Sequence, residues 1–265
     1  MTHYFIDKPL EANTFRAIRL TMDNLIAALE DSRSKQAVSR LSKFDLVLLE
    51  KSFMVALELY AQMKTSMRIR EDGRLFIYHP LEVALYVVDR LKLTDPSVVA
   101  GILLHDTLEY TPMTVAKLKR YFGQTVADIA LDLSQDIDLK NEISLFGESD
   151  LVQRIRIYLP STFAVDSVVP KNELANMAVK LEHYDRLLNR PAHKFSQLIK
   201  IADNLQAYSS IFYVEKNLRK QRTATELDLF SQYVARTAEV LHPPKQVLDD
   251  VAVVVNAWKQ EGEQN

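Results

Sequence analysis

A histidine and an aspartate, His105 and Asp106, stand side by side at the end of an otherwise apolar stretch, Val98–Leu104. A helix of such apolar composition belongs in a protein core, where a carboxylate costs too much free energy to remain without a cation or a metal ion. The pair therefore predicts a buried metal site.

Two further residues can complete such a site. His79 precedes Pro80, which suits the first turn of a helix expected to run to about residue 91. The helix dipole at that end favours a neutral, metal-binding imidazole. Asp203 borders the apolar stripe of a helix expected over 194–220, so its carboxylate is expected to point inward. A packing histidine and a capping or salt-bridged aspartate are the alternative interpretations.

Together these side chains offer two imidazoles and two carboxylates, a mixed set that suits Mn²⁺, Fe²⁺ or Zn²⁺ better than Ca²⁺ or Mg²⁺. An ion with so few protein ligands keeps water, and a water acidified by a metal ion can attack phosphorus. The set thus predicts metal-assisted hydrolysis of a phosphoester or pyrophosphate. Glu109 follows Asp106 by three residues on the same side of the helix, where it can orient or deprotonate the water. A solvated surface glutamate is the alternative.

The composition predicts that helices position these residues. The 265 residues are 48% hydrophobic and include only 5 glycines, which favours helix over sheet and allows a sizeable core. We expect a single all-α domain over 1–265, in which 134–172 forms an irregular loop, lid or solvated connector. Hydrophobic periodicity and capping residues predict two or three helices over about 12–64, followed by helices at about 80–91, 96–109, 114–122, 124–133, 173–189, 194–220 and 223–241. A last helix is expected to end near residue 258.

Charge and composition exclude several classes of protein. A formal net charge of −2 gives no broad basic face for a nucleic acid and no polybasic stretch for a membrane surface. The lack of cysteine excludes disulfides and thiolate metal sites. No apolar run reaches the ~18 residues of a membrane-spanning helix, and the N-terminus has no signal-peptide pattern, so a cytoplasmic location is expected.

The segments around the candidate residues resemble the HD superfamily of metal-dependent phosphohydrolases, whose pattern is H…HD…D. Over about residues 65–212 they are more narrowly similar to the hydrolase domain of RelA/SpoT-type alarmone enzymes. The matching segments are Tyr78–Ala84, Gly101–Glu109, Thr111–Thr114, Tyr121–Ala127 and Leu198–Asn204. This resemblance implies an HD helical bundle with extra N- and C-terminal helices, a core over about 50–220 and a C-terminal helical extension over about 221–265.

The same resemblance implies an activity, the removal of the 3′-pyrophosphate from (p)ppGpp with Mn²⁺. It implies His79, His105, Asp106 and Asp203 as metal ligands and Glu109 as the catalytic carboxylate. The partner is then a small phosphorylated nucleotide.

Several polar residues are expected near this substrate. Arginines in the loop before the first histidine can clamp phosphates, unless they are merely solvated, and one of them falls where the family has a basic residue near the guanine. The lysine and the asparagine that flank the last aspartate are also expected to contact the substrate. The residues concerned are Arg68, Arg70 at the guanine position, Arg74, Lys200 and Asn204.

Two positions depart from the family pattern. Tyr110 stands where the family usually has a second carboxylate, and Ala207 stands where it has an asparagine associated with the sugar. These departures leave open an HD phosphohydrolase acting on another nucleotide or pyrophosphate-bearing metabolite, and a non-catalytic alarmone-binding or regulatory module. The amphipathic terminal helices can pack internally or build an oligomer.

Overall fold

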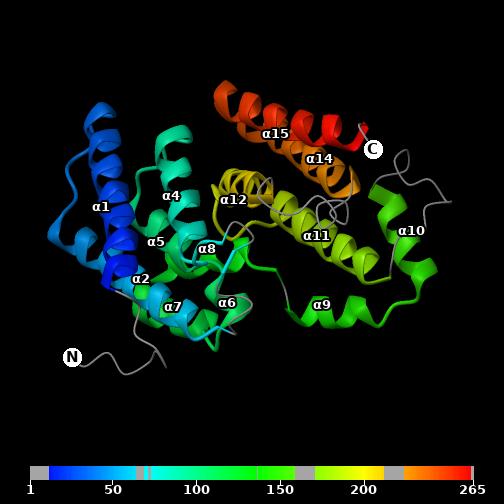
Figure 1. Cartoon of the computed structure of the whole chain (residues 1–265), viewed down its shortest axis with the longest axis horizontal. Helices are drawn as coiled ribbons and strands as arrows, with labels where there is room; N and C mark the ends of the chain where they lie inside the picture. Colours follow the sequence, from blue (N-terminus) through cyan, green and yellow to red (C-terminus); the bar gives the residue numbers. More distant parts are fainter. Residues whose placement is uncertain are drawn as a thin grey trace. The chain divides into compact units, whose positions relative to one another are not determined.

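The computed structural model describes residues 12–63, 69–70, 73–135, 137–158, 171–211 and 224–263. Helices account for nearly all of the regular structure in these ranges, where the one extended pairing is an isolated bridge between Ile69 and Leu75 (Figure 1). The predicted all-α class is confirmed. None of the described helices is both long and apolar enough to cross a membrane.

The chain divides into two compact units. The first comprises Met1–Ser134 and Ile199–Tyr213, and the second comprises Gln135–Leu198 and Val214–Asn265. Helix α12 (Ser196–Ile211) has its first residues in the second unit and the rest in the first. The single domain expected over 1–265, with its core at about 50–220, stays a prediction.

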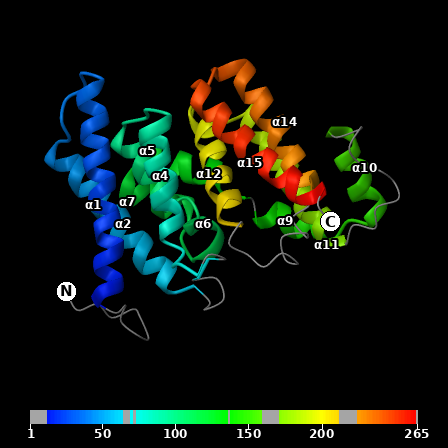
Figure 2. The ribbon, with the colours of Figure 1, turned by 45° about the horizontal axis from the view of Figure 1, so that its top comes forward.

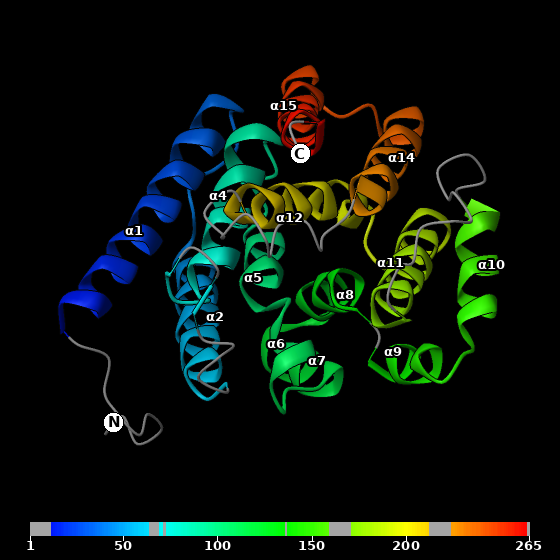
Figure 3. The same cartoon turned by 45° about the vertical axis from the view of Figure 1, so that its right-hand side comes forward.

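The first unit is built around an apolar helix, α5. Besides most of α12, its described helices are α1 (Ala12–Lys35), α2 (Lys43–Ala61), α4 (Tyr78–Arg90), α5 (Pro96–Leu104), α6 (Thr107–Tyr110), α7 (Val115–Phe122) and α8 (Gln124–Leu133). Helix α5 packs against α2, α4 and α8, and Figure 3 shows it beside α8. A Cβ atom at Gly101 would lie 2.8 Å from the Cβ atom of Ile129, so this glycine permits the close approach of α5 and α8.

Local signals in the sequence set where several of these helices begin and end. Ser42 and Asp45 form a capping box at the start of α2, and Asp95 caps α5 just before Pro96. Gly123 separates α7 from α8 with a φ of 95°, a conformation that favours glycine. The predicted helices over 114–122 and 124–133 are confirmed as α7 and α8. Figure 2 shows α1 lying along α4, against which it packs.

The single helix predicted over 96–109 is wrong, because the helix ends at Leu104 and a turn precedes α6. Side chains bind the backbone carbonyls in the last turn of α5. The Thr107 hydroxyl donates to the carbonyl oxygen of Leu104 at 2.6 Å, and Nδ1 of His105 donates to that of Ile102 at 2.7 Å. The His-Asp pair therefore lies in a turn and not in a straight helix.

The described part of the second unit is also helical. Its helices, besides the start of α12, are α9 (Ile137–Ser144), α10 (Glu148–Tyr158), α11 (Lys171–Asn189), α14 (Ala224–Leu241) and α15 (Lys245–Glu263). The irregular structure expected over 134–172 is wrong for α9 and α10, since both pack against α11 and bury Ile143, Leu151 and Ile155. Residues 159–170, and the end of the helix predicted over 194–220, lie outside the described residues.

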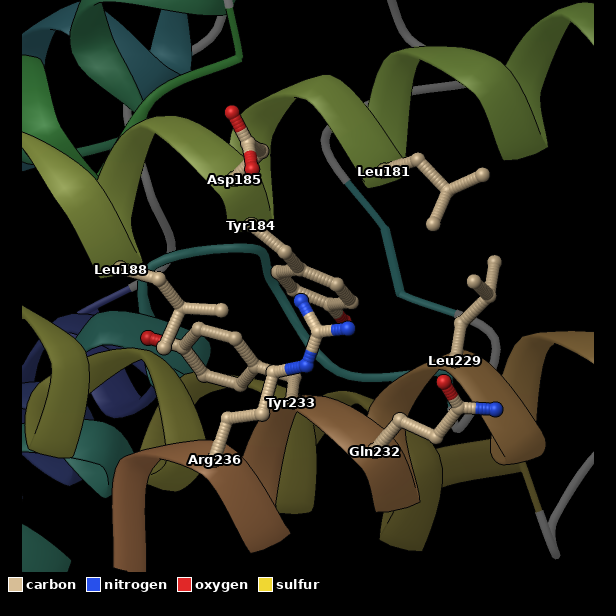
Figure 4. Close-up of a pocket in the computed structure, with 8 residues that line it drawn as sticks. All are labelled: Leu181, Tyr184, Asp185, Leu188, Leu229, Gln232, Tyr233 and Arg236. Atoms are coloured by element: carbon tan, nitrogen blue, oxygen red, sulfur yellow. The ribbon is translucent and has the colours of Figure 1, made fainter. Parts of the chain in front are cut away.

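A small cavity lies between α11 and α14 in the second unit (Figure 4). Tyr184 and Tyr233 line it and stack with ring centroids 4.4 Å apart, while the Tyr233 hydroxyl donates to the carbonyl oxygen of Gln197 at 3.0 Å. Its volume of about 20 Å³ has room for roughly one water molecule. This cavity is too small to hold a substrate.

Candidate metal centre

The structure brings together the four residues expected to bind a metal, all within the first unit. His79 lies in the first turn of α4, His105 and Asp106 form the turn between α5 and α6, and Asp203 lies on α12. All four are buried, with between 1% and 8% of their surface exposed. Each comes from a different stretch of backbone except the adjacent pair, so the site depends on how α4, α5 and α12 pack.

The ligand atoms of these side chains converge on one point. Nε2 of His79 lies 2.8 Å from Oδ1 of Asp203 and 3.7 Å from Oδ2 of Asp106. Nε2 of His105 lies 3.2 Å from Oδ2 of Asp106 and 3.5 Å from Oδ1 of Asp203. His79, His105 and Asp203 each offer one ligand atom, and these atoms lie within 4.8 Å of one another. This buried cluster is suited to a divalent metal ion.

The hydrogen bonds of His105 favour metal binding at its other nitrogen. Nδ1 faces the carbonyl oxygen of Ile102, which only accepts, so Nδ1 keeps a proton and Nε2 is the nitrogen that faces the site and can bind a metal ion in place of a proton. Nε2 of His105 and Oδ2 of Asp106 are buried, and neither has a hydrogen-bond partner within the described part of the chain. Buried polar atoms rarely stay unpaired, and a metal ion would satisfy both of them.

The electrostatics of the site favour a cation. Burial opposes a charge on His105, but the carboxylates of Asp106 and Asp203 outweigh this effect and raise its pKa to about 9. Burial also opposes ionisation of Asp203, yet the Lys200 ammonium and the two imidazoles hold the pKa of that carboxyl well below its usual range. The two carboxylates thus create a negative potential that attracts positive charge.

A row of aromatic rings borders the site, and sequence reasoning missed most of it. The ring centroid of Phe76 lies 5.2 Å from that of Tyr60, 5.9 Å from that of His79 and 5.7 Å from that of Tyr110. Tyr110 is 39% exposed, whereas Tyr60 is buried. Phe76 lies three residues before His79, and this helical spacing is the one signal that points to it in the sequence.

Glu109 and Tyr110 lie on α6, directly after the His-Asp turn. Glu109 is half-buried. Burial and the nearby carboxylates of Asp106 and Glu109 raise the pKa of the Tyr110 phenol, so this group keeps its proton at neutral pH. It therefore offers a hydrogen-bond donor at a position where a carboxylate would offer only acceptors.

The arginines expected to clamp phosphates pair with a carboxylate on α4. Nη1 of Arg70 lies 2.8 Å from Oε2 of Glu82, and Arg74 pairs with the other oxygen of the same side chain. Arg70 and Arg74 therefore share the carboxylate of Glu82. Arg68 lies outside the described residues.

The two residues expected to contact the substrate near Asp203 are both buried. The Lys200 ammonium donates to Oδ2 of Asp203 at 2.8 Å and to the carbonyl oxygen of Leu133 at 3.1 Å. Lys200 therefore contacts a carboxylate of the candidate metal centre. Asn204 follows Asp203 on α12, and its contact with a substrate stays a prediction.

Comparison with known proteins supports the resemblance stated above. No protein-family model matches the chain. It is 38% identical over 68 residues to guanosine-3′,5′-bis(diphosphate) 3′-pyrophosphohydrolase MESH1 of Danio rerio, a match that covers 26% of this chain and 38% of that protein. It is 23% identical over 193 residues to the guanosine-3′,5′-bis(diphosphate) 3′-pyrophosphohydrolase of Spiroplasma citri, which covers 73% of this chain and 21% of that protein.

A third relative carries a different name. The chain is 30% identical over 112 residues to a GTP pyrophosphokinase of Myxococcus xanthus, which covers 42% of this chain and 14% of that protein. The chain thus spans less than half the length of these curated relatives. The hydrolase names confirm the similarity to RelA/SpoT-type enzymes that the motifs indicated.

Proposed function

We propose that this protein is a metal-dependent phosphohydrolase that removes the 3′-pyrophosphate from (p)ppGpp. The observation that carries the proposal is the convergence of His79, His105, Asp106 and Asp203, whose ligand atoms lie 2.8 to 3.7 Å apart in a buried site. The names of the Danio and Spiroplasma relatives support the substrate. The proposed partner is thus a small phosphorylated nucleotide. A cytoplasmic location is also part of the proposal.

The metal would be held by Nε2 of His79, Nε2 of His105 and the carboxylates of Asp106 and Asp203. We favour Mn²⁺, with Fe²⁺ and Zn²⁺ as alternatives, because these ions accept mixed imidazole and carboxylate ligands. When bound, such an ion lowers the pKa of water and stabilises negative charge on phosphate oxygens.

The chain's own residues supply the proton transfer and the orientation of the substrate. Water adds to the phosphorus next to the ribose as its proton passes to the carboxylate of Glu109. The bond to the 3′-oxygen breaks, this oxygen takes up a proton from solvent and leaves as the ribose hydroxyl, and the phosphate group leaves as pyrophosphate. The guanidinium groups of Arg70 and Arg74, which both pair with Glu82, are proposed to donate hydrogen bonds to the anionic substrate. The phenol of Tyr110 can donate a hydrogen bond to a phosphate oxygen.

Tyr110 and Ala207 favour a second candidate function. A phenol replaces the second carboxylate of the family at the exposed end of the aromatic row, which suits an HD phosphohydrolase acting on another nucleotide or pyrophosphate-bearing metabolite. A third hypothesis is that the protein is a non-catalytic alarmone-binding module. Oligomerisation through the terminal helices stays a prediction.

The test is pyrophosphate release from ppGpp by the purified protein with Mn²⁺. We expect release that is lost in Glu109→Ala and Asp106→Ala and kept in Glu239→Ala, a control at an exposed position of α14. If the folded protein releases no pyrophosphate with Mn²⁺, Fe²⁺ or Zn²⁺, the proposal is contradicted. Turnover of another phosphorylated nucleotide in the same assay would favour the second candidate.

A further inference from the structure

Asp203 presents its two oxygens to different partners. Oδ1 faces the imidazoles, 2.8 Å from Nε2 of His79 and 3.5 Å from Nε2 of His105. Oδ2 accepts a hydrogen bond from the Lys200 ammonium at 2.8 Å. The carboxylate therefore lies between the metal-binding imidazoles on one side and a fixed positive charge on the other.

Lys200 is held in place from the opposite side by the end of α8. Its ammonium donates to the carbonyl oxygen of Leu133, the last residue of that helix, where backbone carbonyls lack helical partners and the dipole favours a cation. Lys200 and Asp203 stand three residues apart on α12, so they share a helix face. The lysine is only 7% exposed.

The same end of α8 also contacts the His-Asp turn. Ser134, which follows Leu133, places its hydroxyl 2.7 Å from the carbonyl oxygen of His105 and 2.6 Å from that of Ala130, so the two carbonyls share its single proton. The end of α8 thus supports one side of the site through Ser134 and the other through Lys200. These contacts do not involve a metal ion, so they can hold the site when no ion is bound.

The charges indicate what Lys200 does. Two buried carboxylates without a cation repel each other and resist burial, and Lys200 offsets part of this cost. A divalent ion bound by Oδ1 of Asp203 would offset it as well, but it would also be repelled by the nearby ammonium. Lys200 and the ion therefore compete for the same negative charge.

We infer that Lys200 is a positioning residue that holds Asp203 in place without metal and lowers the affinity of the site for divalent ions. The inference rests on the metal site of the proposed function but does not depend on the substrate. A lysine that only packed would leave metal affinity unchanged. A lysine that only oriented Asp203 would strengthen metal binding.

The experiment measures the Kd for Mn²⁺ by titration calorimetry and the Tm in EDTA and in saturating Mn²⁺. In Lys200→Met, which removes the charge and keeps a similar length, we expect Mn²⁺ to bind about tenfold more tightly or better. The Tm of this variant falls below wild type in EDTA, and the difference shrinks in Mn²⁺. Lys200→Arg, which keeps the charge, retains the wild-type affinity.

Lys180→Met serves as the matched control. Lys180 pairs with Glu226 at 2.9 Å on two helices of the second unit, so this variant also loses a lysine-carboxylate pair. Its Kd for Mn²⁺ should equal that of wild type, and any loss of Tm should be the same in EDTA and Mn²⁺. If Lys200→Met does not fold, Lys200→Gln provides the same comparison.

Weaker or unchanged Mn²⁺ binding in Lys200→Met and Lys200→Gln overturns the inference, as does a wild-type protein that binds no divalent ion. The turnover of ppGpp, measured in the same samples, separates the two proposals. If the Kd for Mn²⁺ changes in the Lys200 variants but ppGpp is not turned over, the proposed substrate alone is removed. If ppGpp is turned over but the Kd for Mn²⁺ is the same in wild type and the Lys200 variants, this inference alone is removed.

Discussion

The contact between α5 and α8 at Gly101 leads to a prediction that links packing to the metal centre. In Gly101→Ala, the added Cβ would lie 2.8 Å from Cβ and 2.9 Å from Cγ2 of Ile129, and 3.3 Å from the carbonyl oxygen of Val126. Carbon atoms in ordinary contact are about 3.5–4.0 Å apart. The two helices must therefore move apart, because the Ile129 Cβ is fixed to its backbone.

The expected loss of stability follows from two opposing effects. Overpacking a core costs about 1–3 kcal/mol, and a contact of 2.8 Å to a Cβ atom fixed to its backbone belongs at the upper end, about 2–3 kcal/mol. Replacing glycine with alanine within a helix stabilises it by about 1 kcal/mol. The net loss should be about 1–2 kcal/mol, which lowers the Tm of a unit of this size by about 2–8 °C. Separation of the helices also weakens the hydrogen bond from Ser134 to His105, so Mn²⁺ affinity should fall.

Thermal unfolding followed by circular dichroism, in EDTA and in Mn²⁺, measures both effects. Gly147→Ala is the control, because its Cβ would meet first the carboxylate of Asp150, a flexible exposed side chain, at 3.2 Å. A Gly101→Ala protein that melts at or above the wild-type temperature refutes the reasoning about this contact. A lower Tm with unchanged Mn²⁺ affinity would refute the link between α8 and the His-Asp turn.

Two other predictions concern the site itself. Asp106→Asn should change the Tm little in EDTA, since the carboxylate that it removes repels Asp203 but attracts His105. The variant should, however, abolish the rise in Tm caused by Mn²⁺. With Mn²⁺ at about 100 times its Kd, that rise corresponds to about 2.7 kcal/mol in wild type. An unchanged rise in the variant contradicts Asp106 as a ligand. Tyr110→Asp should increase kcat for pyrophosphate release from ppGpp by about tenfold, because a second carboxylate can accept a proton that the phenol cannot. A fall in kcat would show that the phenol itself assists the reaction.

The sequence singled out the four residues of the candidate metal centre because each has a local signature. His105 and Asp106 follow an apolar helix, His79 precedes a helix-starting proline, and Asp203 borders an apolar stripe. These signals depend on short-range periodicity and capping, which act within a few residues. The inward direction of each side chain could therefore be predicted locally, whereas the resemblance to the H…HD…D pattern implied that the four side chains meet.

The features that sequence reasoning missed depend on contacts between distant residues. The break after Leu104 is stabilised partly by Ser134, whose hydroxyl reaches the carbonyl oxygen of His105 across 29 residues of chain. Lys200 was expected near the substrate, but its ammonium binds the carbonyl oxygen of Leu133, 67 residues away. Helices α9 and α10 are short and become stable only by packing against α11. None of these contacts leaves a local pattern.

We propose that one divalent ion binds between α4, the His-Asp turn and α12. Crystals grown with Mn²⁺, measured at the manganese absorption edge, test it most directly. We expect a single anomalous peak within bonding distance of His79, His105, Asp106 and Asp203, and no peak there in Asp106→Asn crystals. An anomalous peak elsewhere, or a hydrogen-bonded cluster without an ion in Mn²⁺-saturated crystals, would contradict it.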